Sequence, residues 1–378
     1  MRRREFLVAA AGTAVIAGTG RGVAGQAGAY TLAAGPNGKT LRTPDGRIVF
    51  EYMTQKPSDT DMSANSVCCF APVNSPAGER LTVFGQGHRH YRGVFFGWHT
   101  VEFREPVPAP AMPGGGGRGG GRRGGGDGGR TGGDGAGRQG GAAGRPAGPP
   151  PSPEVLARQN QPTRGNVLIG DYWGWGRYAL VNGRAIKNRD VKLVSADRLS
   201  AQLEMQNEWM VYDQALLHES LSASIREVPG AYVLDLTYVF APNNVDVVLP
   251  EWSFGGFCVS GRSDAQSAYY FGPDGKVDLP NPSMVDGNTS WPESPWYGRT
   301  HVLDGKTAGY AVVNHASNPR TRWWNPPSTG NIQPSIVTYG EYRIPNGQPL
   351  TLKYRVVAYD GEFSGERLNQ LASEWRAS

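Results

Sequence analysis

Three of the six histidines and two arginines lie close together in residues 88–99, which read HRHYRGVFFGWH. Side chains two positions apart share one face of a β-strand, so a strand here would place His88, His90 and Arg92 side by side. His99 would point to the opposite face of an unbroken strand. Imidazoles beside a guanidinium could transfer a proton and hold an anion or a developing oxyanion. The segment is therefore a candidate catalytic and substrate-binding site.

The same two histidines could instead bind a divalent metal. Zinc sites use three or four ligands, and no nearby Asp or Glu completes the set around His88 and His90. These two residues are therefore only weak metal candidates, and no cofactor is expected. A third alternative is a pair of structural histidines whose nitrogens are bonded to the backbone.

A carboxylate stands beside a large aromatic side chain at Glu251 and Trp252, just before the pair Gly255-Gly256. An aromatic neighbour can raise the pKa of a carboxyl group enough for it to act as an acid or base. The alternative is a glutamate at a strand end that is paired with one of the many arginines. Glu251 is a catalytic candidate and Trp252 a substrate-binding candidate on the first interpretation.

Segment 312–327, VVNHASNPRTRWWNPP, follows a strand-like run and is broken by prolines. Irregular loops that are rich in polar and aromatic groups often carry function. His315 is a catalytic candidate there. The substrate-binding candidates in this segment are Asn318, Arg320 and Trp323.

Four further tryptophans lie beside glycine or proline, where loops are expected. They are Trp173, Trp175, Trp291 and Trp296. Flat aromatic faces suit the C–H faces of sugar rings, but tryptophans can also close the ends of a β-sandwich core. Trp173, Trp175 and Trp296 are candidates for sugar binding, whereas Trp98 and Trp209 are expected in the core.

The elements that must position these residues are mostly strands. In 232–240 and 350–358, apolar residues alternate with others at a period of two. Asp-Gly and Asn-Gly pairs at 44–47, 181–184, 273–276 and 303–306 are typical of hairpin turns. A single helix is expected near the C-terminus, with Ser364 as its N-cap. These patterns predict an all-β protein, a large β-sandwich with a short C-terminal helix.

Two stretches are expected to lie outside the folded body. Residues 1–29 resemble a twin-arginine signal peptide, with Arg3 and Arg4 before a short apolar run, and they predict a periplasmic or secreted protein. Residues 105–164 are rich in glycine, arginine and proline and predict a disordered insertion. The remaining residues of 30–378 are expected to form one domain, and none of their apolar runs is long enough for a transmembrane helix.

Charge and cysteine content limit the classes of partner. Of the net charge of +5, the signal carries +3 and the glycine-rich tract +4, which leaves about −2 for the folded body. A nucleic-acid partner is not expected, because it needs clustered Lys and Arg on the folded surface. The cysteines are Cys68, Cys69 and Cys258. One bridge from the adjacent pair to Cys258 is an alternative to three buried, apolar cysteines.

Four stretches resemble the exported bacterial family often labelled "methane oxygenase PmoA", a domain of unknown function. They are GHRHYRGVFFGW (87–98), EWSFGGFCV (251–259), DGKTAGYAVVNHASNPRTRWW (304–324) and PLTLKYRVVAYDGE (349–362). The family's three-histidine pattern would align here with His88, His90 and Tyr91, so one histidine is replaced. The resemblance implies an exported all-β sandwich, similar to galactose mutarotase, with glycoside or oxidised-sugar chemistry. Methane oxidation is not expected, because the membrane subunit of that name has several spans.

The leading hypothesis is an exported carbohydrate-active protein, a hydrolase or lyase that acts on a glycoside or keto-sugar. His88, His90, Glu251 and His315 would supply acid–base catalysis. The alternatives are a non-catalytic sugar-binding protein and a His-ligated metal oxidoreductase. The expected partner is a carbohydrate or glycoside, and the sequence does not indicate an oligomeric state.

Overall fold

The computed structural model describes residues 28–58, 67–85, 90–105, 163–164, 167–174, 183–252, 255–280 and 291–377. The signal peptide expected at 1–29 lies outside the described residues except for its last two. The insertion expected at 105–164 lies outside them except at its two ends. The predictions of a signal peptide and of a disordered insertion therefore stay untested.

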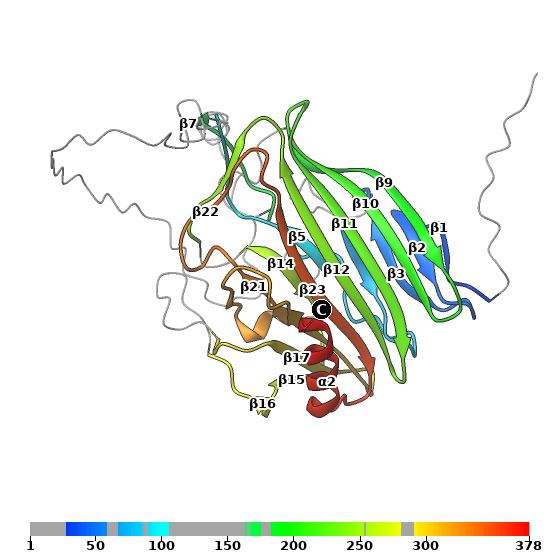
Figure 1. Cartoon of the computed structure of the whole chain (residues 1–378). Coiled ribbons are helices and arrows are strands. Elements are labelled where there is room, and N and C mark those ends of the chain that lie inside the picture. Colours follow the sequence, from blue (N-terminus) through cyan, green and yellow to red (C-terminus); the bar gives the residue numbers. More distant parts are fainter. Residues whose placement is uncertain are drawn as a thin grey trace, which may run out of the picture.

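Two large antiparallel sheets make up most of the described chain (Figure 1). In sheet order, the seven-stranded sheet contains β1 (Thr31–Ala34), β2 (Gly38–Arg42), β3 (Ile48–Met53), β4 (Cys69–Val73), β5 (Val94–Gly97), β14 (Gly256–Ser260) and β20 (Asn331–Ile332). The nine-stranded sheet contains β16 (Gly275–Val277), β15 (Ser267–Gly272), β17 (Trp296–Leu303), β18 (Lys306–Asn314), β23 (Leu350–Asp360), β12 (Ala231–Pro242), β11 (Gln214–Val228), β10 (Ser200–Val211) and β9 (Arg184–Ala196).

Smaller elements surround these sheets. A five-stranded sheet contains β22 (Tyr342–Ile344), β13 (Asp246–Leu249), β6 (Val101–Arg104), β8 (Val167–Gly170) and β7 (Thr163–Arg164). A two-stranded sheet pairs β19 (Arg322–Trp323) with β21 (Pro334–Ser335). The helices of the described residues are the 3₁₀ turn η2 (Pro327–Thr329) and the α-helix α2 (Gly365–Arg376).

The main hydrophobic core lies between the seven- and nine-stranded sheets. Phe96 of β5 meets Phe240 of β12 across it, with ring centroids 4.7 Å apart. Alternate residues of β12, such as Leu234 and Leu236, face this core, as the period of two predicts. Trp209 also lies in it, fully buried. The prediction of an all-β sandwich is thereby confirmed.

Turn chemistry explains the hairpin between β17 and β18. Asp304 and Gly305 both have positive φ, 49° and 75°, as a type I′ turn requires. Asp and Gly tolerate this backbone region better than most residues. The turn predicted at 303–306 is therefore confirmed.

The helix α2 covers the outer face of the nine-stranded sheet (Figure 1). The hydroxyl of Ser364 accepts a hydrogen bond from the Arg367 amide at 3.2 Å, which confirms the predicted N-cap. Leu368 and Leu371 are buried against the sheet, where Arg355 of β23 donates to the Leu371 carbonyl at 2.5 Å. The middle strands of this sheet are thus covered on both faces.

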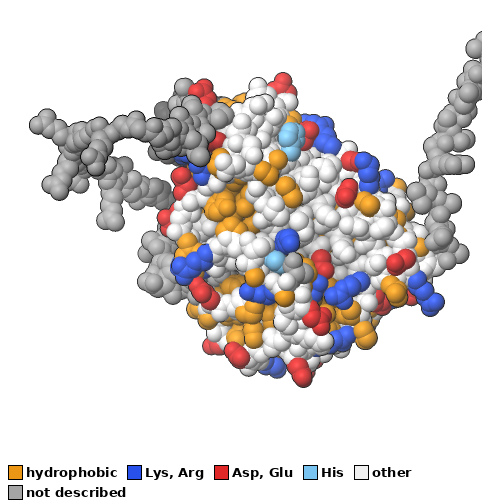
Figure 2. Space-filling view, viewed as in Figure 1, with side chains coloured by type: hydrophobic (Ala, Val, Ile, Leu, Met, Phe, Trp, Pro, Cys, Tyr) orange, Lys and Arg blue, Asp and Glu red, His pale blue; other side chains and the backbone are white. Residues whose placement is uncertain are grey.

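The surface shows no dominant charge on the face in Figure 2, where Lys and Arg side chains are interspersed with Asp and Glu. Among the described residues, no helix is both long and apolar enough to cross a membrane.

Candidate functional site

The His90–Arg92 segment is not the strand that the sequence predicts. His90 lies in a turn, Arg92 forms an isolated bridge with Phe84, and β5 begins only at Val94. The reason is Gly93, whose φ is +77° and whose backbone lies so close to Phe70 that a Cβ would collide with its carbonyl. His88 lies outside the described residues, so its alignment with His90 is untested.

Arg92 lies beneath the surface, with 1% of its area exposed. Its guanidinium is 4.4 Å from the centre of the Phe95 ring, and Nη2 donates to the carbonyl of Tyr172 at 3.1 Å. Burial lowers the pKa of Arg92 to about 10, so it keeps its charge at neutral pH. The expectation that Arg92 binds substrate does not fit this burial. The side chain instead fixes the loop that begins at Asp171.

That loop also carries Trp173, which is buried rather than open to a ligand. The Trp173 ring lies 4.9 Å from Phe95, and the ring of His90 lies 6.2 Å from it. Asp171 explains why the Trp173 side chain points inward. Its Oδ1 accepts hydrogen bonds from the amides of Trp173 and Gly174, both at 2.9 Å, and these bonds fix the turn. The sugar-stacking role predicted for Trp173 does not fit this position. Trp175 lies outside the described residues.

Trp173 belongs to a small core on the outer face of the seven-stranded sheet, here called the outer-face cluster. Its buried members are Met53, Cys69, Ala71, Phe95, Trp173, Cys258 and Trp324. Cys69 and Cys258 both pair with Phe95 from opposite sides. They are two strand spacings apart, roughly 9–10 Å, which is too far for a disulfide. Cys68 faces the other way, with its thiol 3.5 Å from the Ile186 carbonyl, and all three cysteines are free.

His99 and Asp171 form a pair that the sequence did not reveal. The Nε2 of His99 is 3.7 Å from Oδ2 of Asp171, and its Nδ1 is 3.1 Å from the hydroxyl of Thr100. The imidazole stacks on Trp252, with ring centres 4.6 Å apart and planes 6° apart. Burial lowers the pKa of His99 to about 4, so the ring is neutral at neutral pH. Since both nitrogens have neighbours, His99 orients Trp252, which is 37% exposed beside the exposed Glu251.

His315 follows β18 and is buried against α2. Its ring meets Trp375 edge to face at 4.8 Å, and its Nδ1 is 2.7 Å from the Ser317 hydroxyl. Burial lowers the pKa of His315, and the nearby cations of Lys353 and Arg376 add to this effect. The side chain shapes the loop after β18 at this position.

Asn318 shapes the same loop. Its amide donates to Oδ1 of Asn314 at 2.7 Å and to the Lys353 carbonyl at 2.7 Å, and its Oδ1 accepts from the Lys353 amide at 2.8 Å. These bonds attach the loop to β23. Asn318 therefore supports the adjacent side chains and has few groups left for a ligand.

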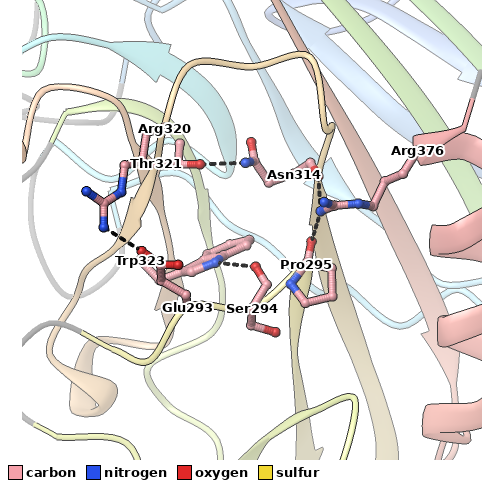
Figure 3. A pocket seen from close by; sticks show the side chains of 8 residues that line it. All are labelled: Glu293, Ser294, Pro295, Asn314, Arg320, Thr321, Trp323 and Arg376. Carbon is pink, nitrogen blue, oxygen red and sulfur yellow. Dashed lines mark hydrogen bonds and ion pairs between the residues drawn. The ribbon is translucent and has the colours of Figure 1, made fainter.

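A pocket of about 460 Å³ opens next to this loop (Figure 3). Its lining residues are Glu293, Ser294, Pro295, Asn314, Arg320, Thr321, Trp323 and Arg376. Trp323 is 2% exposed and belongs to the main core, so it borders the pocket with an edge, and its Nε1 donates to the Ser294 carbonyl at 2.7 Å. The sugar-stacking role predicted for Trp323 does not fit this burial. The amide of Asn314 donates to the hydroxyl of Thr321 at 2.5 Å. The pocket thus combines one indole with amide, hydroxyl, guanidinium and carboxylate groups.

Charged groups form one rim of the pocket. Arg320 donates to Oε1 of Glu293 at 2.9 Å, and both side chains are 71% exposed. Tyr339 donates to the same oxygen at 3.1 Å, and the guanidinium groups of Arg320 and Arg322 lie 4.0 and 4.2 Å from its ring centre. The hydrogen bonds from Arg320 and Tyr339 lower the pKa of Glu293, which is therefore ionised at neutral pH.

Arg376 reaches the opposite side of the pocket from the last turn of α2. Its Nη1 donates to the carbonyls of Pro295 at 3.4 Å and Asn314 at 2.7 Å. Burial lowers its pKa. Neither Arg376 nor Glu293 is a sequence-predicted site residue. Only the tertiary fold brings Arg376 and Glu293 into the same pocket as Arg320 and Trp323.

Trp296 does not lie in a loop as expected. It is the first residue of β17, fully buried between the sheet and α2, and its Nε1 donates to Asn369 at 2.9 Å. Trp291 is buried in the main core as well, and Trp98 lies in the same core as predicted. The indole of Trp296 therefore holds the helix on the sheet and is closed to a sugar.

The predicted acid–base residues have different surroundings. His90 lies against Trp173, Glu251 is exposed beside Trp252, and His315 lies against α2. Arg320 and Trp323 line the pocket, and Asn318 and His315 belong to the loop behind it. The described ranges contain no group of three or more His, Cys, Asp or Glu side chains that could hold a metal. The metal site predicted at His88 and His90 stays untested.

Comparisons with solved structures give only distant likenesses. The GH36 alpha-galactosidase AgaA from Geobacillus stearothermophilus is 8% identical, with a TM-score of 0.31 over 47% of this chain and 28% of that chain. The galactosidase domain of the alpha-galactosidase-sucrose kinase AgaSK is 10% identical, with the same TM-score and the same coverage. The chain thus spans less than a third of either structure. No curated protein matches the sequence.

A family comparison is more informative. Residues 163–373 match the model of DUF6807, a family of unknown function. This agrees with the resemblance to a domain of unknown function, although the match gives no link to the label PmoA. Because the matched residues are more than half of the chain, the protein belongs to the family of unknown function DUF6807.

Proposed function

We propose that this protein is an exported carbohydrate-binding protein and that the pocket between Arg320 and Arg376 holds the sugar. The observation that carries the proposal is the composition of the pocket. The amide of Asn314, the hydroxyl of Thr321 and the carboxylate of Glu293 offer donors and acceptors around the indole of Trp323. Sugar hydroxyls both donate and accept hydrogen bonds, and small-molecule sites commonly combine aromatic walls with a few polar groups.

The pocket supports binding better than hydrolysis. Most glycosidases use two carboxyl groups that are roughly 5–10 Å apart, one of them with a raised pKa. Among the eight lining residues, Glu293 is the sole carboxylate, and its pKa is lowered. His315 is directed toward Ser317 and Trp375 instead of contributing to the lining. We therefore favour the sugar-binding alternative over the hydrolase or lyase.

Export places this activity outside the cytoplasm in our proposal. The twin-arginine pattern at Arg3 and Arg4 supports it. In a periplasmic or secreted setting, the ligand would be a free sugar, a glycoside or the end of a polysaccharide.

The proposal is tested by filling the pocket. Thr321→Phe places a large ring among the lining residues, whereas Thr351→Phe changes an exposed position of β23 and is the matched control. Isothermal titration of both variants and wild type with a panel of monosaccharides and methyl glycosides measures the effect. We expect Thr321→Phe to weaken binding by about tenfold or more and Thr351→Phe to leave it unchanged.

A third variant tests another surface. Trp252→Ala removes the exposed indole that stacks on His99. If binding is lost in Trp252→Ala and kept in Thr321→Phe, the pocket is the wrong site. If no sugar in the panel binds to wild type, carbohydrate binding itself is refuted.

A further inference from the structure

The charges of the pocket do not balance. Its lining holds two arginines, Arg320 and Arg376, and one glutamate, Glu293, which gives a net charge of +1. Figure 3 shows the two arginines entering from opposite sides, with Trp323 between them. A pocket with this arrangement attracts an anionic group more strongly than a neutral one.

The single carboxylate is already engaged on one side. Glu293 accepts from Arg320 at 2.9 Å and from Tyr339 at 3.1 Å through the same oxygen. Arg322 also stacks on Tyr339, which adds a further cation close to this rim. Glu293 therefore neutralises part of the charge at its own side of the pocket.

Among the described residues, no carboxylate is paired with Arg376. Within the described part of the chain, its hydrogen bonds go to two backbone carbonyls, those of Pro295 and Asn314, and no carboxylate lies within 4.0 Å of its guanidinium. Both carbonyls accept from Nη1, so Nε and Nη2 have donors left for a ligand. An anion that pairs with this group in good geometry offsets part of the cost of partly burying its charge.

We propose that the ligand of this pocket is an acidic sugar, a uronic acid whose carboxylate is held by Arg376. The inference rests on the proposed carbohydrate-binding function and specifies its ligand class. A planar carboxylate matches the forked donors of a guanidinium in shape and charge. In this arrangement the hydroxyls of the same ring meet Asn314 and Thr321 in the lining of the pocket.

The first experiment compares matched pairs of ligands by isothermal titration of the purified full chain. The pairs are galacturonate with galactose and glucuronate with glucose. We expect the acid of at least one pair to bind about tenfold more tightly than its neutral partner. The preference should shrink in high salt, because ions screen an exposed charge pair. Inorganic sulfate should compete poorly, since it lacks the ring, and equal competition by sulfate would overturn the proposal.

Charge variants give a second, independent measurement. Glu293→Gln raises the net charge of the lining to +2, so the ratio of acid to neutral affinity should rise about threefold. Glu204→Gln makes the same change at an exposed position of β10 and should leave the ratio unchanged. Arg376→Met should abolish the preference, and Arg376→Lys should keep only part of it, because an ammonium group retains the charge but lacks the forked donors. If Arg376→Met does not fold, the ratio of acid to neutral affinity in Glu293→Gln still tests the proposal.

The outcomes separate the two proposals. Equal affinities for acid and neutral sugars, or a ratio that does not respond to Glu293→Gln, would refute the acidic ligand and leave carbohydrate binding intact. Absence of binding by all four sugars and by the methyl glycosides would refute carbohydrate binding.

Discussion

Two regions of this molecule combine arginine with aromatic side chains, and they differ in how far water reaches them. Beside the outer-face cluster, Arg92 lies over the Phe95 ring, is 1% exposed and donates to a backbone carbonyl. At the pocket, the Arg320 side chain is 71% exposed and lies on a tyrosine at the rim. Similar residues therefore do different work, because burial decides whether a guanidinium fixes the fold or is available to a ligand.

The largest effect that separates the regions should come from the two arginines. Arg92→Ala leaves a cavity above Phe95 and frees the Tyr172 carbonyl, so we expect a loss of about 3–5 kcal/mol in the free energy of unfolding. Arg320→Ala should leave the urea midpoint unchanged, because exposed ion pairs contribute little. Equal urea midpoints for Arg92→Ala and Arg320→Ala would contradict the structural role that we assign to Arg92 alone.

Buried and exposed carboxylates should also respond differently to pH. Glu219 lies in the main core, where its oxygens accept from Asn207 at 2.8 Å and Trp209 at 2.7 Å, and burial raises its pKa from 4.5 to about 7. The folded state therefore binds more protons than the unfolded state between these values. Stability should fall by about 3 kcal/mol as the pH rises from 4.5 to 7 and then level off.

Glu219→Gln isolates this dependence. The variant cannot titrate, so the difference in unfolding free energy between it and wild type should change across pH 4.5–7, whatever its baseline stability. Urea denaturation at several pH values measures the difference. Parallel curves for the two proteins would contradict the raised pKa of Glu219.

Gly97→Ala tests how tightly the Arg92 region is packed. A Cβ at Gly97 would lie 2.7 Å from the Tyr172 carbonyl oxygen and 2.9 Å from Nη2 of Arg92, so we expect a cost of about 1–3 kcal/mol. Gly272→Ala is the matched control, since its nearest neighbour would be 3.6 Å away on Tyr297. A control that is destabilised as much as Gly97→Ala would remove the evidence for tight packing.

The smallest effect concerns the rim of the pocket. Tyr339→Phe removes one hydrogen bond to Glu293, so the pKa of Glu293 should rise slightly toward its usual value. Arg320→Gln should raise it further, because the bond from Arg320 is the larger cause. Carbon-detected NMR titration of the Glu293 carboxyl group measures both shifts. No shift in either variant would show that these bonds do not form in solution.

The fold was largely predictable from the sequence, because its signals are local. The alternation in β12 and β23, the Asp304-Gly305 turn and the Ser364 cap each depend on neighbours within a few residues. Two local predictions failed where a nonlocal contact decides. Gly93 breaks the expected histidine strand where its backbone meets β4, and Trp296 is buried because α2 covers the outer face of the sheet.

The site was predictable only in part. Arg320 and Trp323 stand out in an irregular polar segment, which is a local signal. Glu293 lies between Trp291 and Trp296, but the sequence marks only the tryptophans of that segment and not its carboxylate. Arg376 lies at the end of the C-terminal helix, where nothing nearby distinguishes it from other surface charges. The same holds for His99 and Asp171, which meet at 3.7 Å only after β5 and β8 are in place.

The free cysteines give the molecule built-in probes of its own motion. Cys69 and Cys258 are buried in the outer-face cluster, and Cys68, the residue before Cys69, contacts the opposite layer. Burial raises the pKa of Cys69 to about 12, so alkylation must wait for local opening. The alkylation rates of these thiols would then report the local opening of the two layers separately, with no engineered cysteine.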